Sequence, residues 1–313
     1  MRALITGVAG FIGSTLADRL LDQGDKVRGI DCFTDYYDQS AKRSNVTKAL
    51  QSENFTLIDD DLLSCDLNRL LTDVDVVFHQ AGQPGVRLSW ADGFETYTRL
   101  NIVATQRLLE AATAHPLKRL VYASSSSVYG AAERFPTLET DLPAPMSPYG
   151  VTKLAAEQLC SLYHHNFGVP TVSLRYFTVY GPRQRPDMAM CRLIDSAVNG
   201  AEFVMFGDGS QIRDFTYVDD IAEANILAAS APEAIGEVLN IGGGSAATML
   251  DVVDAVTEAA GTPPNLTFGE KALGDVHQTG ASVEKAMRIL DWAPTVNVRD
   301  GVANQVQAAM SSK

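Results

Sequence analysis

The chain has 313 residues, of which 46% are hydrophobic and 20% are charged, and its formal net charge at pH 7 is −13. This composition is that of an ordinary globular protein, and the length suits one large domain with a smaller one attached. A strongly acidic chain is a poor general partner for nucleic acids and for anionic membranes. We therefore expect neither nucleic acid nor a membrane as a partner.

The cysteines, Cys32, Cys65, Cys160 and Cys191, show neither a CxxC pair nor the spacing of zinc ligands. We expect reduced thiols and no metal site. No apolar run is long enough to span a bilayer, and the N-terminus lacks the hydrophobic segment of a signal peptide. A cytoplasmic location is therefore the expectation.

The first half of the chain alternates short apolar runs with helical patterns. The apolar runs predict strands at Ala3–Thr6, Val27–Ile30, Phe55–Ile58, Val74–Phe78, Leu120–Ala123 and Thr171–Leu174. Helices are predicted at Phe11–Gln23, Thr98–Ala114 and Pro148–Asn166. This alternation favours an α/β fold with a doubly wound parallel sheet. Prolines break the pattern near residue 180, so we expect domains at 1–180 and 181–313, with some later segments returning to the first sheet.

A glycine-rich turn follows the first predicted strand. Gly7, Gly10 and Gly13 form a GxxGxxG pattern that also contains Phe11 and Ile12, and it lies between a strand and a helix. In that position, glycine lets the backbone approach a pyrophosphate, whose charge then lies at the helix N-terminus. This context predicts a Rossmann-type dinucleotide site.

Acidic residues follow the second and third predicted strands. Asp31 ends the second strand, where a carboxylate accepts hydrogen bonds from ribose hydroxyls and repels a 2′-phosphate, which favours NAD over NADP. Asp61 and Leu62 follow the third strand and are candidates to face the adenine, although Asp59 and Asp60 compete for that position.

The predicted catalytic residues lie after the fifth strand. Ser124–Ser127 follow Leu120–Ala123, and Tyr149 and Lys153 are four residues apart on one face of the next predicted helix. A tyrosine beside an ammonium is a plausible general base. The ammonium and a positively charged nicotinamide both favour the phenolate and lower its pKa.

Together these motifs resemble the extended short-chain dehydrogenase/reductases, specifically the nucleotide-sugar epimerases and dehydratases. The resemblance covers essentially the whole chain and rests on Gly7, Gly10, Gly13, His79–Gly82, Asn101, Ser124–Ser125, Val128–Gly130, Tyr149, Lys153, Arg175–Phe177, Tyr180–Pro182, Arg213–Phe215 and Val218–Asp220. It implies a tightly bound NAD that takes a hydride from a sugar C4 and usually returns it.

The resemblance also assigns roles to individual residues. It implies that Ser125 assists Tyr149 in catalysis and that Lys153 binds the nicotinamide ribose. It further implies a homodimer formed through the two helices Thr98–Ala114 and Pro148–Asn166. Cofactor contacts are implied for Gln80, Ala81, Gly82, Asn101 and Tyr176.

Two segments distinguish groups within this family. Ser126 and Ser127 stand where the 4,6-dehydratases carry an Asp-Glu pair, and the UDP-glucuronate decarboxylases carry Glu in place of Ser127. Both activities are therefore disfavoured. Galactose-type epimerases usually have Asn in place of Thr178, whereas Thr178 followed by Arg185-Pro186-Asp187-Met188 resembles the UDP-glucuronate 4-epimerases.

Glucuronate chemistry gives a physical reason for Arg185. A guanidinium offers a two-pronged fork to a carboxylate, and Thr178 with Ser126 or Ser127 supplies hydroxyls. The 4-keto intermediate is a β-keto acid, which loses CO₂ when the bond to its carboxylate aligns with the ketone π system. Our hypothesis is that these residues hold the carboxylate out of that alignment.

The sugar nucleotide is expected to bind at the smaller domain. Arg213 matches the family's diphosphate-binding arginine, Arg87 is a second candidate, and Asp275 is an expected substrate contact. Relatives often carry Arg where this chain has Ala272. The expected activity is the NAD-dependent C4 epimerisation of UDP-glucuronate. A UDP-glucuronate decarboxylase, a neutral UDP-sugar 4-epimerase and a non-catalytic dinucleotide sensor stay open.

Overall fold

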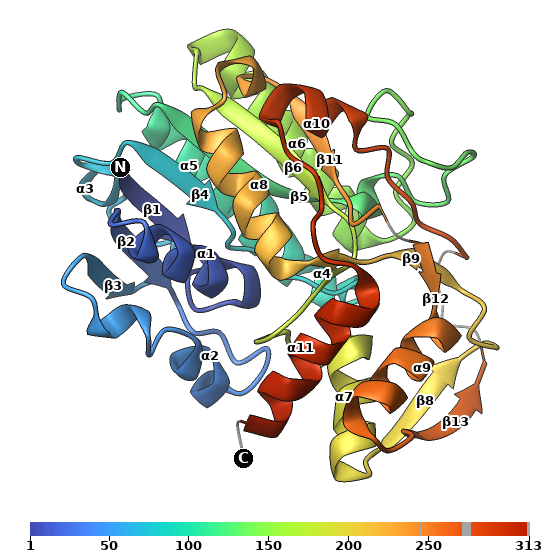
Figure 1. Ribbon diagram of the computed structural model, residues 1–313. Helices are drawn as coiled ribbons and strands as arrows, with labels where there is room; N and C mark the ends of the chain where they lie inside the picture. The colour runs from blue at the N-terminus through green and yellow to red at the C-terminus, as the bar shows by residue number, and fades with distance from the viewer. Residues whose placement is uncertain (245, 271–276, 312–313) are drawn as a thin grey trace.

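The computed structural model describes residues 1–244, 246–270 and 277–311 (Figure 1). Its centre is a seven-stranded sheet with the order β11-β6-β5-β4-β1-β2-β3, and all neighbouring strands in it are parallel. The strands are β1 (Arg2–Thr6), β2 (Lys26–Asp31), β3 (Phe55–Asp59), β4 (Val76–His79), β5 (Arg119–Ser125), β6 (Thr171–Tyr176) and β11 (Val238–Ile241). The predicted parallel α/β architecture is confirmed.

Helices cover both faces of this sheet. On one face, a core built around Ile5 and Phe78 packs against α1 (Phe11–Asp22), α8 (Val218–Ser230) and α10 (Glu284–Leu290). On the other face, Leu4 and Val77 pack against α3 (Leu67–Leu71), α5 (Ala104–Ala112) and α6 (Pro148–Phe167). Because successive side chains of a strand point to opposite faces, the unbroken apolar runs of the sequence fill both cores.

The helix predicted at Thr98–Ala114 has an irregular first half. The short α4 (Gly93–Tyr97) runs into a π-helical turn at Thr98–Val103, and only then does α5 begin. Asn101 lies in this turn and is buried, and its side chain binds the backbone of Gln83. A π turn is often found at functional sites. Here it places Asn101 against the loop that follows β4.

A smaller lobe is built mostly from the C-terminal part of the chain (Figure 1). Its core joins α7 (Ala189–Asn199), β8 (Glu202–Phe206), α9 (Met249–Ala260), β13 (Asn265–Gly269) and α11 (Val298–Ser311). The remaining short strands are β7 (Val179–Tyr180), β9 (Ile212–Asp214), β10 (Thr216–Tyr217) and β12 (Ala246–Thr248). Both α8 and β11 come after residue 180, and both belong to the central sheet and its helical cover.

The strand order reverses at β1 and β4, which are neighbours at the middle of the sheet. In an open parallel sheet, the carboxyl ends of the strands at this switch point form a crevice where ligands bind. The short α2 (Gln39–Asn45) follows β2 on the way to β3. Within the described ranges, no helix is long and apolar enough to cross a membrane.

Candidate active site

The glycine turn between β1 and α1 is shaped for close backbone contact. Gly7 has a φ of +68°, and a Cβ atom added to it would lie 2.8 Å from the backbone nitrogen of Ala81. A Cβ atom on Gly13 would lie 2.3 Å from the carbonyl oxygen of Gly7. Gly10 is the N-cap of α1 and has no side chain, so it gives the first amide groups of the helix no side-chain hydrogen bond. The turn is a cradle that only glycines leave open.

A cavity of about 240 Å³ extends from this turn across the carboxyl ends of the strands. Among the residues predicted for the site, it is lined by Gly7, Gly10, Phe11, Ile12, Gly13, Asp31, Asp61, Leu62, Gln80, Ala81, Gly82, Tyr149, Lys153, Tyr176 and Arg185. The cavity therefore brings the expected cofactor residues and the expected catalytic pair to one place.

Asp31 lies at the end of β2, where its carboxylate accepts hydrogen bonds from the backbone amides of Ala9 (3.0 Å) and Phe33 (2.9 Å). Burial raises the pKa of this carboxyl group, while those amides and the nearby charge of Lys42 act against the increase. Lys42 also lines the cavity, and its ammonium donates to the carbonyl (2.6 Å) and hydroxyl (2.7 Å) of Thr34. Sequence reasoning missed Lys42 because it lies in a polar loop and helix without a motif.

Asn101 was expected to contact the cofactor, and in the structure its side chain binds the loop that lines the cavity. Its side-chain oxygen accepts from the Gln83 amide (2.6 Å), and its amide group donates to the Gln83 carbonyl (3.0 Å) and to the Thr152 hydroxyl (3.0 Å). A Cβ atom on Gly82 would lie 2.9 Å from the same oxygen. Asn101 therefore fixes the loop that lines the cavity and is not among the lining residues.

Tyr149 and Lys153 lie on α6, whose first turn is fixed by Ser147 accepting a hydrogen bond from the Gly150 amide (3.1 Å). A hydrogen bond with Ser125 and the charge of Arg185 lower the pKa of Tyr149, but burial outweighs both and the pKa is raised. The sequence predicted the opposite direction, because it counted charges and left desolvation out.

Lys153 is also buried, and burial lowers the pKa of its ammonium to about 8. The negative charge of Glu157 opposes that decrease, and the ammonium lies over the ring of Tyr122, 4.6 Å from its centroid. A group with this pKa is mostly protonated at neutral pH. It supplies a positive charge next to the helix face that carries Tyr149.

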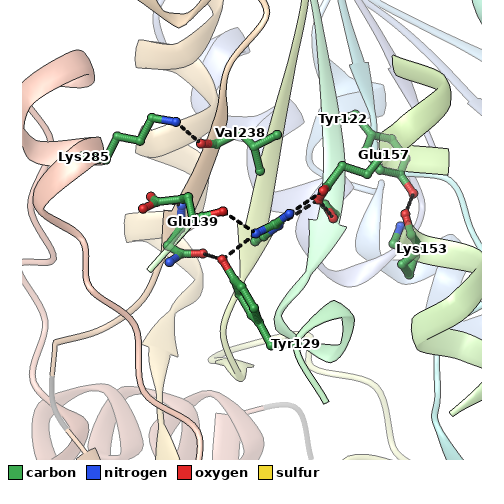
Figure 2. A network of polar contacts seen from close by, with 10 residues as sticks. Tyr122, Tyr129, Glu139, Lys153, Glu157, Val238 and Lys285 are labelled. Carbon is green, nitrogen blue, oxygen red and sulfur yellow. Dashed lines mark hydrogen bonds and ion pairs between the residues drawn. The ribbon is translucent and has the colours of Figure 1, made fainter. Parts of the chain in front are cut away.

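A buried polar network lies behind these residues (Figure 2). Glu157 accepts hydrogen bonds from Ser124 Oγ (2.6 Å) and from Nε (3.0 Å) and Nη2 (2.6 Å) of Arg175. Nη1 of Arg175 donates to the Tyr129 hydroxyl (2.6 Å), which in turn donates to Asn240 (2.7 Å). The network connects α6 to β5, β6 and β11, and it fixes α6 relative to the sheet.

Arg185 enters the cavity from the loop after β7. Its Nε and Nη2 atoms bind the two carboxylate oxygens of Asp187 at 2.9 and 3.1 Å, and 16% of its side chain is exposed. From the sequence, we predicted that this guanidinium binds a substrate carboxylate. In the structure, Asp187 holds the fork, because the two residues are close neighbours in one turn.

Ser126, Ser127, Thr178, Arg87 and Arg213, the other predicted substrate residues that the structure describes, are not among the residues that line this cavity. Ser126 and Ser127 lie in the 3₁₀ turn Ser126–Val128, and the Ser127 amide donates to Ser125 Oγ (3.1 Å). Thr178 is partly buried between β6 and β7, and its carbonyl accepts from the Thr216 amide.

The two candidate diphosphate arginines lie at the lobe. The guanidinium of Arg87 stacks 4.3 Å from the ring centroid of Phe206, and Arg213 donates to the carbonyl oxygens of Ile212 and His277. Asp275, with Lys271 and Ala272, lies outside the described residues. Across the described part of the chain, no group of acids, histidines or cysteines is arranged to hold a metal ion.

Comparison with known proteins identifies the family. Residues 3–242 match the NAD dependent epimerase/dehydratase family. A Bacillus subtilis protein named as an uncharacterized UDP-glucose epimerase, YtcB, is 45% identical, covering 98% of this chain and 97% of its own length. The UDP-glucuronate 4-epimerase of Thermodesulfobacterium geofontis is 36% identical, covering 97% of this chain and 94% of its own length.

Solved structures agree with the sequence matches. A crystal structure of UDP-glucuronic acid 4-epimerase from Bacillus cereus with UDP-glucuronic acid and NAD is 43% identical and covers 100% of both chains with a TM-score of 0.97. Since the family match covers most of the chain and the relatives span nearly all of it, this chain belongs to the NAD dependent epimerase/dehydratase family.

Proposed function

We propose that this protein catalyses the NAD-dependent C4 epimerisation of UDP-glucuronate to UDP-galacturonate through a 4-keto intermediate. One observation carries the proposal: a single cavity joins the glycine cradle to Tyr149, Lys153 and Arg185. The likeness to the Bacillus cereus structure with UDP-glucuronic acid and NAD supports the choice of sugar. In this proposal, residues 1–180 bind NAD and residues 181–313 mainly bind the sugar nucleotide.

The cavity fits NAD on its own geometry. Gly7 and Gly13 line the cavity and allow a backbone approach that any Cβ atom would prevent, and Asp31 lines the same cavity. We assign the cofactor contacts to the predicted residues that line the cavity, with Asn101 supporting the loop behind them. When bound there, NAD accepts a hydride from C4 of the sugar and returns it to the opposite face.

Tyr149 acts as the general base in this proposal. Its phenolate takes the proton of the C4 hydroxyl, and the hydrogen bond with Ser125 and the charge of Arg185 both favour that phenolate. Ser125 bridges the tyrosine and the sugar hydroxyl. Lys153 keeps a positive charge next to the pair and binds a ribose hydroxyl of the cofactor.

Arg185 holds the substrate carboxylate away from the geometry that leads to loss of CO₂. Its position in the cavity, within electrostatic reach of Tyr149, supports this role. The other proposed substrate contacts are Thr178, Ser126 and Ser127 at the sugar, and Arg213, Arg87 and Asp275 at the nucleotide.

The proposal is tested by incubating the NAD-loaded protein with UDP-glucuronate and following the sugar by proton NMR. Formation of UDP-galacturonate without a pentose product is the expected result. A UDP-pentose or a 4-ketopentose would show decarboxylation and would contradict the interpretation of Ser127. Absence of any product, with NAD bound, would contradict the glucuronate assignment.

A neutral UDP-sugar epimerase is the second candidate, and one observation favours it. Arg185 is paired with Asp187, so one edge of its guanidinium is already bonded to an acid of the chain. The same NMR assay with UDP-glucose separates the two candidates. Tyr149→Phe should abolish turnover of either sugar while NAD binding persists. A sensor without catalytic activity would show no turnover in the parent protein.

We also propose a homodimer formed through α5 and α6, in the cytoplasm. Two large apolar side chains, Val151 and Leu162, are exposed on one face of α6, and an unpaired apolar helix face is typical of an interface. The free cysteines agree with a reducing compartment. Light scattering of the parent protein and of Leu162→Glu tests the assembly, and a monomeric parent would contradict it.

A further inference from the structure

Arg185 and Asp187 form an ion pair with two hydrogen bonds. The guanidinium uses two nitrogen atoms on the two oxygen atoms of one carboxylate, at 2.9 and 3.1 Å, which is the geometry that also binds a substrate carboxylate best. Arg185 lines the cavity, whereas 39% of the Asp187 side chain is exposed at its edge. An acid from the chain itself therefore already binds one edge of the guanidinium that could receive an acidic ligand.

A second element holds Asp187 in place. The Tyr36 hydroxyl, from the loop after β2, donates to Asp187 Oδ2 at 3.2 Å, and the guanidinium of Arg185 lies 5.9 Å from the centroid of the Tyr36 ring. Tyr36 also packs against Gly85, where an added Cβ atom would lie 2.6 Å from its hydroxyl. Residues far apart in the sequence thus meet around one ion pair at the cavity wall.

The chemistry of this arrangement separates acidic from neutral sugars. The negative charge of Asp187 lowers the positive potential that an incoming carboxylate meets at Arg185, and it repels that carboxylate at short range. A neutral sugar carries no charge for Asp187 to repel, so its affinity does not depend on Asp187 in this way.

We infer that Asp187 is an internal competitor for the charge of Arg185 and a specificity-determining residue of the site, which weakens the binding of a sugar carboxylate. This inference rests on the proposed function, since it assumes that Arg185 receives the substrate carboxylate. Asp187 acts through Arg185 and has no role in the transfer of hydride or proton. It sets the affinity for acidic sugars and leaves the affinity for neutral sugars unchanged.

The test is calorimetric titration of the NAD-loaded protein with UDP-glucuronate, UDP-glucose and UDP. Asp187→Asn keeps the shape of the side chain and removes its charge. We expect the affinity for UDP-glucuronate to rise about fivefold, the scale of one partly exposed ion pair, and the affinities for UDP-glucose and UDP to stay within about twofold. Tyr36→Phe removes the hydrogen bond that holds Asp187 and should give a smaller rise of the same selectivity.

Asp195→Asn is the matched control, because Asp195 lies on α7 of the same lobe and is not among the cavity-lining residues. It changes the net charge equally and should leave all three affinities unchanged. A fall in UDP-glucuronate affinity in Asp187→Asn would show that Asp187 orients Arg185 and would overturn the inference. An equal rise for all three ligands would show a general charge effect and would also overturn it.

Arg185→Gln separates this inference from the proposed function. If it lowers the affinity for UDP-glucuronate to near that for UDP-glucose, Arg185 is the carboxylate site, and the Asp187→Asn result alone decides the inference. If Arg185→Gln leaves the ratio of the two affinities unchanged, Arg185 does not bind the carboxylate, and both fail. Thermal melting of each variant confirms that the affinities are measured on folded protein.

Discussion

Removing the charge of Glu157 should destabilise the protein strongly, because this carboxylate is the only acid bonded to the buried guanidinium of Arg175 among the contacts of the described residues. Glu157 is fully buried and 4% of the Arg175 side chain is exposed. Breaking a buried ion pair by removing one partner costs about 3–5 kcal/mol, since the other charge stays buried without compensation. Arg175 keeps its hydrogen bond to Tyr129, so we expect a loss at the lower end of that range, about 3 kcal/mol, for Glu157→Gln.

Guanidinium chloride unfolding of the NAD-free protein measures this value. Ser124→Ala is the matched control, because it removes one neutral hydrogen-bond donor from the same carboxylate and should cost about 1.5 kcal/mol, the lower end for a hydrogen bond to a charged group. The double variant Glu157→Leu/Arg175→Met removes both charges and should recover most of the loss. A Glu157→Gln loss below about 1 kcal/mol, or a double variant no more stable than the single one, would refute the reasoning.

Three further predictions concern the cavity and the core around it. Gly13→Ala places a methyl group 2.3 Å from the Gly7 carbonyl oxygen, so fluorescence titration should show at least about a tenfold loss of NAD affinity. Asn101→Ala leaves the Gln83 amide without its partner and should lower the unfolding free energy by about 1–3 kcal/mol in denaturant titration. Burial lowers the pKa of His79 to about 3. Between about pH 6.5 and 3, the unfolded chain therefore binds one more proton at His79 than the folded protein does. The contribution of His79 to the free energy of unfolding is fully present above about pH 6.5 and falls by up to about 1.4 kcal/mol for each unit that the pH decreases. Replacing His79 by Gln should remove that part of the slope, as measured by unfolding at pH 7, 6 and 5.

Local sequence patterns predicted the frame of the fold and one side of the cavity. Buried parallel strands are unbroken apolar runs, and a glycine-rich turn between a strand and a helix is typical of a dinucleotide cradle, so β1, α1 and the turn at Gly7–Gly13 were predicted correctly. That Tyr149 and Lys153 lie on one helix was predicted for a similar reason, because spacing along a helix fixes which side chains share a face.

Contacts between distant segments could not be predicted in the same way. Tyr36 meets Asp187 across 151 positions of sequence, and no periodicity in either loop signals the contact. Asn101, in the π turn, accepts a hydrogen bond from the backbone amide of Gln83, which lies on another loop. The raised pKa of Tyr149 depends on burial, which packing decides and which a count of neighbouring charges leaves out.

Two positively charged side chains that line the cavity each lie next to an acid. Arg185 is paired with Asp187, and Lys42 faces Asp31, so each of these cations near the cavity has an acid beside it. In a chain of net charge −13, these acids lower the local positive potential that an anionic substrate meets. If Asp187 competes for Arg185 as we infer, binding of an acidic sugar depends on short-range competition between carboxylates rather than on long-range attraction. Such a site would then discriminate between ligands by how well a carboxylate competes with one that the protein already holds.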